Sequence, residues 1–251
     1  MFDVAAESYG RFMGQWSEPL ADHLVSLVAP EPGQRVLDVG CGPGALTGRL
    51  VERLGPEAVA AVDPSAPFVA ATRARFPGAD VREAAAESLP YDDDTFDLCL
   101  AQLVVHFMAD PVAGLREMAR VTRPGGLVAA SVWDHGGGRG PLSPFWSAVR
   151  SLRPGESGES SLPGSREHDL TRLFAEAGLT GVTETEQGVT LGFPSFEAWW
   201  EPYTLGVGPA GAYVGRMAPK DRDVVRERCR ERLPAPPFEL SSWAWTATAR
   251  V

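Results

Sequence analysis

The sequence predicts an α/β fold in which a doubly wound, mostly parallel sheet carries helices on both faces. The first observation is that short, almost continuously apolar runs recur through the first half of the chain. Such runs are typical of strands that are buried on both faces. The second observation is that segments with apolar residues at helical spacing separate these runs, as the crossover helices of a parallel sheet would.

Each element of the first half follows from this alternation. Strands are expected at residues 35–39, 58–62, 80–83, 96–101 and 127–133. Helices are expected around the apolar positions Leu46, Leu50, Val51 and Leu54, and over residues 66–75 and 111–121. Gly55-Pro56 and Pro77-Gly78 follow the first two helices, because Gly suits the left-handed residue after a helix and Pro cannot continue one.

The second half has a different rhythm. Residues 136–140 and 154–165 are rich in Gly, Pro and Ser, which predicts loops. A helix over 169–177, a strand over 182–191, a helix over 219–232 and a final strand over 240–251 are expected in that order. An aromatic-rich segment, 193–213, lies among them.

Charge and cysteine content exclude several classes of protein. The 251 residues include 33 acidic and 23 basic side chains, so the formal charge is −10, and no basic run offers the stripe that nucleic-acid binding requires. No apolar stretch is long enough to cross a bilayer, and the first residues do not resemble a signal peptide. Cys41, Cys99 and Cys229 lie far apart, which indicates reduced thiols and no metal site. We therefore expect a cytoplasmic protein that binds neither nucleic acid nor membrane.

The sharpest signal is the segment Val36-Leu37-Asp38-Val39-Gly40-Cys41-Gly42-Pro43-Gly44, between a predicted strand and a predicted helix. Glycines in such a turn let a ligand approach the chain closely, and the start of the next helix offers unpaired N–H groups. Asp63 ends the second strand, where an acid can accept hydrogen bonds from two ribose hydroxyls. The structural alternative for Asp63 is an Asx turn before Pro64.

This segment resembles motif I of the class I S-adenosylmethionine (SAM)-dependent methyltransferases, in their small-molecule branch with a type 11-like domain. Further matches, in order, are Tyr9 to Ser17, Asp63-Pro64-Ser65, Ala86-Glu87-Ser88-Leu89-Pro90-Tyr91, Phe96-Asp97-Leu98 and Arg123-Pro124-Gly125-Gly126. The resemblance is strong over about residues 30–135 and only an outline in the last third.

The resemblance implies a Rossmann-like sheet of seven strands whose last strand is antiparallel. It also implies a single domain over residues 1–251, with an N-terminal cap (1–30), a SAM-binding core (31–135), and lid insertions together with the remaining strands (136–251).

The same resemblance implies a site for SAM, whose product is S-adenosyl-L-homocysteine (SAH). The expected cofactor-binding residues are Tyr9, Asp38, Gly40, Cys41, Gly42, Asp63, Pro64, Ala85, Ala86, Glu87, Gln102 and Leu103. Many relatives carry an acid for the adenine amino group where this chain has Ala85, so backbone, water or another side chain must make that contact. A buried structural role is the alternative for Asp38 and for Gln102.

His135 and His106 are the candidate general bases, because both follow strands at the carboxyl edge of the sheet, where such folds bind ligands. A base is needed only if the acceptor is a weakly acidic hydroxyl or an amine. The alternative for His106 is packing within an apolar stretch, and the alternative for His135 is a place in a flexible loop.

Aromatic residues at and beyond the end of the fifth strand are expected to line the acceptor pocket. They are Trp133, Phe145, Trp146, Trp199, Tyr203 and Tyr213. An aromatic lining implies an apolar or aromatic small molecule, although each ring could instead pack the lid against the sheet. Trp199 and Trp200 cannot both face one side of a helix, so at most one is expected in the pocket.

The resulting hypothesis is a methyltransferase that moves a methyl group from SAM to a small, apolar or aromatic acceptor by direct displacement, with O-methylation favoured. It is expected to be a monomer or a homodimer. The main alternative is a non-catalytic SAM-binding regulatory or scaffold protein. Aminopropyl transfer is disfavoured because residues 101–108 offer no acid for a polyamine. A NAD-dependent dehydrogenase is disfavoured because the segment from Asp38 to Gly42 and the turn Arg123-Pro124-Gly125-Gly126 fit that class poorly.

Overall fold

The computed structural model describes residues 6–251, so residues 1–5 of the expected N-terminal cap lie outside the described residues. One seven-stranded sheet has the order β3-β2-β1-β4-β5-β7-β6. Its strands are β1 (Val36–Val39), β2 (Val59–Asp63), β3 (Asp80–Glu83), β4 (Phe96–Gln102), β5 (Thr122–Trp133), β6 (Thr180–Phe193) and β7 (Phe238–Arg250). β1 to β5 pair in parallel, and β7 runs antiparallel to β5 and β6. The predicted fold class, including the antiparallel last strand, is confirmed.

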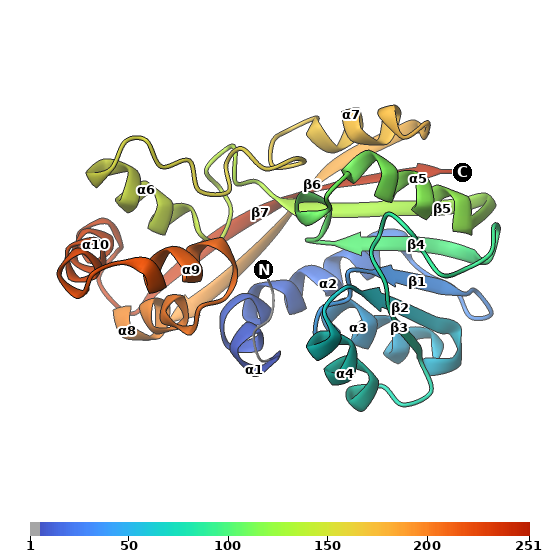
Figure 1. Cartoon of the computed structure of the whole chain (residues 1–251), viewed down its shortest axis with the longest axis horizontal. Coiled ribbons are helices and arrows are strands. Elements are labelled where there is room, and N and C mark those ends of the chain that lie inside the picture. The colour runs from blue at the N-terminus through green and yellow to red at the C-terminus, as the bar shows by residue number, and fades with distance from the viewer. Residues whose placement is uncertain (1–5) are drawn as a thin grey trace.

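Helices cover both faces of this sheet (Figure 1). On one face lie α2 (Gln15–Val28), α3 (Ala45–Leu54) and α4 (Ala66–Arg75), and on the other lie α5 (Pro111–Val121) and α7 (Asp169–Glu176). Alternate residues of β2 pack into different clusters, since Ala60 and Val62 contact the α5 side while Ala61 contacts the α4 side. Burial on both faces explains why the strands have nearly continuous apolar runs.

The N-terminal segment consists of α1 (Ala6–Tyr9), the π-helical turn η1 (Gly10–Gly14) and α2. Leu20, Ala21 and Leu24 recur at helical spacing along α2 and are fully buried. This packing places α1 and η1 near the carboxyl ends of the core strands, where the cavity described below opens (Figure 1).

β6 and β7 are longer than the sequence predicted, and they pair continuously from Thr183–Thr248 to Phe193–Phe238. They reach beyond the core to a second group of helices (Figure 1). These are α6 (Ser143–Leu152), α8 (Phe196–Trp200), the 3-10 turn η4 (Glu201–Leu205), α9 (Gly208–Arg216) and α10 (Pro219–Arg232). We call this part, with its stretches of β6 and β7, the helical lobe.

The sequence analysis assigned no helix to α6, which lies between two loop-forming segments. Its buried residues Phe145, Ala148 and Val149 nevertheless recur at helical spacing. β5 begins at Thr122 rather than at Leu127, because Thr122 pairs with Phe96 before a register shift. The Arg123–Gly126 segment is therefore an irregular extension of this strand.

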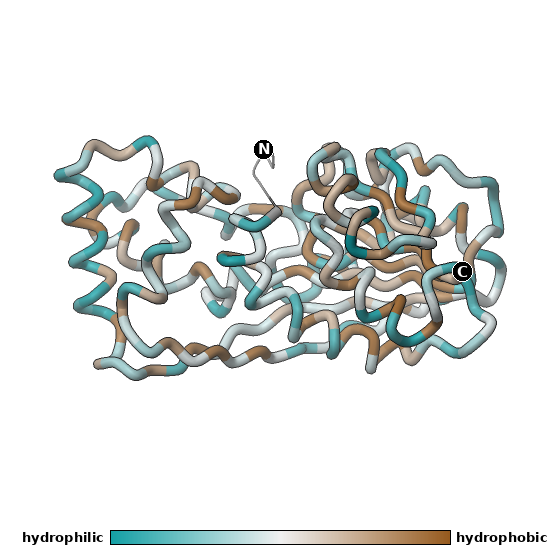
Figure 2. Tube along the Cα trace, turned by 90° about the horizontal axis from the view of Figure 1, so that it is seen from below, coloured by the Kyte–Doolittle hydropathy of each residue, from teal (hydrophilic) through white to brown (hydrophobic). Residues whose placement is uncertain are grey.

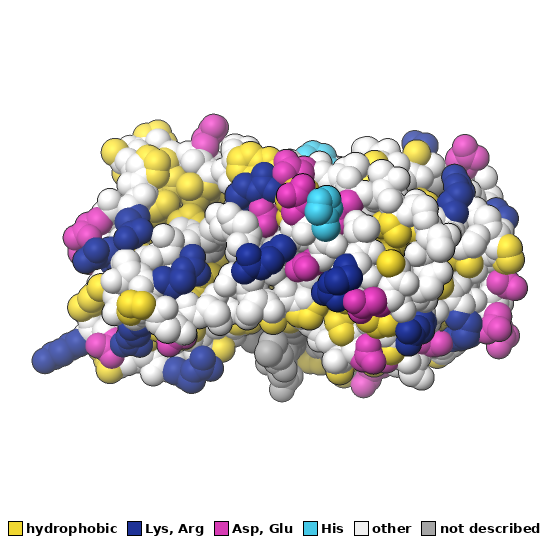
Figure 3. Space-filling view, turned by 90° about the horizontal axis from the view of Figure 1, so that it is seen from above, with side chains coloured by type: hydrophobic (Ala, Val, Ile, Leu, Met, Phe, Trp, Pro, Cys, Tyr) yellow, Lys and Arg dark blue, Asp and Glu magenta, His cyan; other side chains and the backbone are white. Residues whose placement is uncertain are grey.

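The surface matches the charge pattern of the sequence. α10 is hydrophilic along most of its length (Figure 2), and its buried residues are Val225 and Cys229. Lys and Arg side chains stand among Asp and Glu on the face in Figure 3.

Within residues 6–251, no helix has both the length and the apolar character needed to cross a membrane. The same range contains no cluster of three or more His, Cys, Asp or Glu that could hold a metal ion.

Candidate functional site

The glycine turn after β1 has the backbone geometry that only glycine adopts readily. Gly40, Gly42 and Gly44 have φ angles of 73°, 52° and 90°. A Cβ atom at Gly40 would lie 2.7 Å from the Cβ of Val104, whereas a Cβ at Gly42 would meet no atom of residues 6–251 within 4 Å. Gly42 therefore faces open space, and Gly40 is required for close packing of the turn against the segment after β4.

Asp63 fixes this turn from the end of β2. Its Oδ2 accepts a hydrogen bond from the Gly42 N–H at 2.9 Å, and its Oδ1 accepts one from the Ser65 N–H at 2.8 Å. The side chain is 7% exposed, and burial raises the pKa of the carboxyl group. Each oxygen has a second lone pair, so the carboxylate can hold the turn and still accept from two ligand hydroxyls.

Asp38 is the second buried acid near the turn. Its Oδ2 accepts a hydrogen bond from the Thr47 hydroxyl of α3 at 2.6 Å. Burial raises the pKa of Asp38 to about 7. The residue also lines the cavity described next, so its position is compatible with both the structural and the ligand-binding interpretation.

A cavity of about 850 Å³ opens at the carboxyl ends of the strands, where β1 and β4 are neighbours although they are not consecutive. Ligands of doubly wound folds bind at such a switch point. The predicted cofactor-binding residues all line it: Tyr9, Asp38, Gly40, Cys41, Gly42, Asp63, Pro64, Ala85, Ala86, Glu87, Gln102 and Leu103. His106, His135 and Trp133 line the same cavity.

The part of the cavity beyond β3 carries acids that flank Ala85. Glu87 lines it, and its Oε1 also accepts from the Asp110 N–H at 3.1 Å. Glu83, which the sequence analysis missed, lines it from the end of β3. Its place at the carboxyl end of a parallel strand was the available signal. Leu89, expected beside the adenine, is not among the residues that line the cavity.

Gln102 and Leu103 join the core to the N-terminal segment. The Gln102 side-chain amide donates to the Ser17 carbonyl oxygen at 2.9 Å, while its Oε1 has no hydrogen-bond partner in the described part of the chain. Leu103 has a φ of 61°, which is unusual for a bulky residue, and its N–H donates to the Ser131 carbonyl oxygen at 2.8 Å. A strained backbone beside a ligand cavity is typical of functional sites.

The two candidate bases lie together although 29 positions of sequence separate them. The ring centroids of His106 and His135 are 6.0 Å apart, and the side chains are 5% and 9% exposed. Burial lowers the pKa of His135 to about 4 and that of His106 well below its usual range. Both rings are therefore neutral near pH 7, and Nδ1 of His106 has no hydrogen-bond partner among residues 6–251.

Asp134 does not complete a triad with these histidines. Its Oδ1 accepts from the Gly137 N–H at 2.8 Å and its Oδ2 accepts from Arg139 Nε at 2.5 Å. Arg139 also pairs with Glu186 of β6 at 2.7 Å. Asp134 thus fixes the loop after β5.

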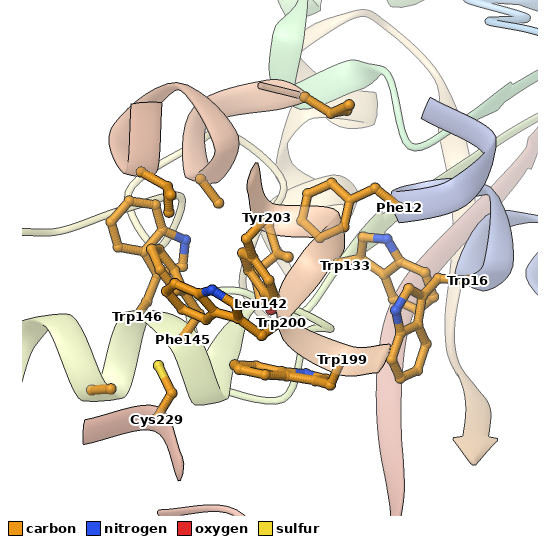
Figure 4. Close-up of a cluster of buried hydrophobic side chains, with 14 of the residues drawn as sticks. Phe12, Trp16, Trp133, Leu142, Phe145, Trp146, Trp199, Trp200, Tyr203 and Cys229 are labelled. Atoms are coloured by element: carbon orange, nitrogen blue, oxygen red, sulfur yellow. The ribbon is translucent and has the colours of Figure 1, made fainter. Parts of the chain in front are cut away.

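The predicted pocket aromatics separate into two groups. Trp133 lines the cavity, whereas Phe145, Trp146, Trp199, Tyr203 and Tyr213 do not. All six pack within or against one buried cluster that joins the helical lobe to the N-terminal segment, and Figure 4 shows Phe145, Trp146, Trp199 and Tyr203 in it. Phe145 stacks on Tyr203 with centroids 4.8 Å apart, and Trp199 contacts Tyr203 at the same separation. Trp199 and Trp200 are both buried, at 3% and 6% exposure, and neither is among the residues that line the cavity.

Further lining residues escaped the sequence analysis. They are Phe12 and Met13 of η1, Leu142 directly before α6, Glu159 and Leu162 in the loop after α6, and Val207, Gly208 and Pro209 at the start of α9. No local pattern marks them, because they meet only through the packing of three segments that are distant in sequence. This second part of the cavity, near the helical lobe, is called the acceptor end below.

Comparisons with known proteins agree with this geometry. A family model described as a methyltransferase domain matches residues 37–130. A malonyl-(acyl-carrier protein) O-methyltransferase of Salmonella typhimurium is 34% identical over 173 residues, which cover 64% of this chain and 68% of that protein. The enzyme of the same description from Erwinia billingiae is 35% identical over 130 residues, 52% of this chain and 51% of its own length. The match thus spans only about half the length of some curated relatives.

A solved structure shows the same fold. The YcgJ protein of Bacillus subtilis superimposes with a TM-score of 0.60 at 17% identity, over 94% of this chain and 98% of that protein.

Proposed function

The chain belongs to the class I SAM-dependent methyltransferases, and on that premise we propose that it methylates a small organic acceptor with an apolar body. The observation that carries this proposal is one continuous cavity, lined at one end by the glycine turn and Asp63 and at the other by a neutral histidine pair. We also propose that residues 1–251 act as one catalytic domain, as a monomer or a homodimer.

The cofactor fits the residues at the first end. Gly42 presents its backbone to open space, and Asp63 keeps free lone pairs for ribose hydroxyls. Glu83 and Glu87 line the cavity on either side of Ala85 and would supply acceptors to an adenine amino group. When bound, SAM supplies a methyl group on a positively charged sulfur. After transfer of the methyl group, the sulfur remains in SAH as a neutral thioether. The burden on the chain is then to orient the acceptor, exclude water and remove a proton.

The histidine pair is suited to removing that proton. A neutral imidazole accepts the proton that a hydroxyl or amino group releases as its new bond to the methyl carbon forms. The low pKa of His135 makes it a weak base in the resting protein, so the transfer must occur together with bond formation. Leu142, Leu162 and Val207 surround the acceptor end with apolar side chains.

Two measurements test the proposal. Isothermal titration calorimetry with SAM, SAH and NAD determines the cofactor, and SAH formation over a panel of alcohols, phenols and amines determines turnover. Binding of SAM with turnover of a panel member is the expected result. SAM binding without turnover across the panel would favour the non-catalytic alternative, and binding of NAD in place of SAM would refute the assignment.

A further inference from the structure

Glu159 is a buried acid at the acceptor end of the cavity that the proposed reaction does not use. It lies in the loop between α6 and α7, is 2% exposed, and lines the cavity near Leu162. The loop is held beside the histidine pair, because the Gly136 N–H donates to the Ser165 carbonyl oxygen at 2.8 Å. Glu159 is thus placed beside the space for the acceptor.

The surroundings of Glu159 differ from those of a structural acid. Its Oε2 accepts from the indole N–H of Trp146, and within residues 6–251 no Lys, Arg or His forms an ion pair with it. Asp134 is equally buried but is matched by Arg139 and a backbone N–H. A buried carboxyl group whose hydrogen bonds come only from neutral donors, the Trp146 indole and its own backbone N–H, is costly for folding, and burial raises the pKa of Glu159 to about 7. Such a group facing a cavity is typical of a ligand contact.

The charged groups along the whole cavity restrict which acceptors it suits. Among the lining residues that lie within 6–251, none is Lys or Arg. The carboxylic acids among them are Asp38, Asp63, Glu83, Glu87 and Glu159, and the two histidines are neutral. An anionic acceptor would lose its hydration shell there without gaining a cationic partner. A group that donates hydrogen bonds would instead satisfy the acid.

We propose that Glu159 selects the acceptor, which is a neutral or cationic molecule that donates a hydrogen bond from a hydroxyl or amino group to this carboxyl group. The inference rests on the proposed function, since it assumes that the cavity beyond the SAM site holds the methyl acceptor. It excludes carboxylates and phosphates as the preferred group at that position.

The test uses three probes with a common phenyl ring: 2-phenylethanol, 2-phenylethylamine and 3-phenylpropanoate. Their dissociation constants for the full-length, SAH-loaded protein are measured by calorimetry at pH 8. The wild type is expected to bind the alcohol and the amine about tenfold more tightly than the carboxylate. Glu159→Gln keeps an acceptor oxygen but loses the charge, so it weakens amine binding about tenfold and leaves alcohol binding within about threefold.

Glu156→Gln is the matched control, because Glu156 belongs to the same loop and does not line the cavity. It should leave all three constants unchanged. The SAH titration separates the two hypotheses: failure to bind SAH refutes the proposed function, whereas normal SAH binding with another probe order refutes only the role of Glu159.

Tighter binding of the carboxylate than of both donors by the wild type overturns the proposal without any variant. An unchanged amine constant in a Glu159→Gln protein that binds SAH normally overturns it as well. So does a wild type that binds neither donor probe at about 10 mM, a concentration at which ligands of this size bind a suitable pocket.

Discussion

Replacement of Asp63 by Ala should weaken SAH binding strongly, because this carboxylate is proposed to hold the ribose and also fixes the glycine turn. The two expected ribose bonds are hydrogen bonds to a charged acceptor, each contributing about 1.5–3 kcal/mol. Losing both at the lower value costs about 3 kcal/mol, which corresponds to a loss of affinity of about a hundredfold. The loss of the Gly42 and Ser65 contacts acts in the same direction, because the turn must then order as the ligand binds.

Asp63→Asn sharpens the test. The amide has one acceptor oxygen and one NH₂ group, so one of the two backbone N–H groups at 2.8–2.9 Å would face a donor. The Asn variant should therefore also bind SAH poorly despite its equal size. Asp94→Asn, in an exposed turn away from the cavity, is the control for a loss of charge. Calorimetry on proteins with matched unfolding temperatures measures each constant. An Asp63→Ala variant that binds SAH within about threefold of the wild type would refute the role of this residue.

Three further predictions concern other parts of the cavity. Gly40→Ala should lower both the unfolding temperature and SAH affinity, because φ is 73° and the new Cβ would overlap Val104; a differential scanning calorimetry trace like that of the wild type would contradict this. His135→Ala should lower kcat at saturating acceptor by about 10²–10⁴-fold if this ring takes the proton, whereas a change in KM alone would assign it to binding. Glu159→Gln should stabilise the protein at pH 8 but not at pH 4. The folded pKa of about 7 lies above the ordinary value of 4.5, so the contribution of Glu159 to stability is most favourable below pH 4.5 and falls by up to about 3 kcal/mol as the pH rises from 4.5 to about 7. Urea unfolding at the two pH values measures this difference, and an equal gain at both would disprove it.

The cofactor end of the cavity could be predicted from the sequence because its determinants are local. A buried strand, three glycines and a helix start are adjacent in the chain, so Gly40 and Gly42 come together whatever the rest of the protein does. Asp63 follows from one further rule, that parallel strands end at the same edge.

The acceptor end is different, since it depends on which face each ring presents. Tyr203 and Phe145 stack on each other, and no sequence pattern distinguishes a ring packed in this way from a ring that faces a ligand. Glu159 escaped attention because a Gly- and Ser-rich loop gives no periodicity from which burial could be inferred. Similarly, β6 contains Thr and Glu at its start, so only its pairing with β7 shows how far it extends.

The continuous ladder of β6 and β7 has a mechanical consequence. The same two strands run through the core and the helical lobe. A rigid rotation of the lobe against the core would therefore have to bend both strands and break hydrogen bonds between them. Entry and exit of small molecules should therefore depend on two short segments that line the cavity, η1 and the first turn of α9. Displacing either segment breaks far fewer hydrogen bonds than bending the β6–β7 ladder does. We therefore expect the cavity to open by local movement of these two segments and not by closure of one lobe onto the other.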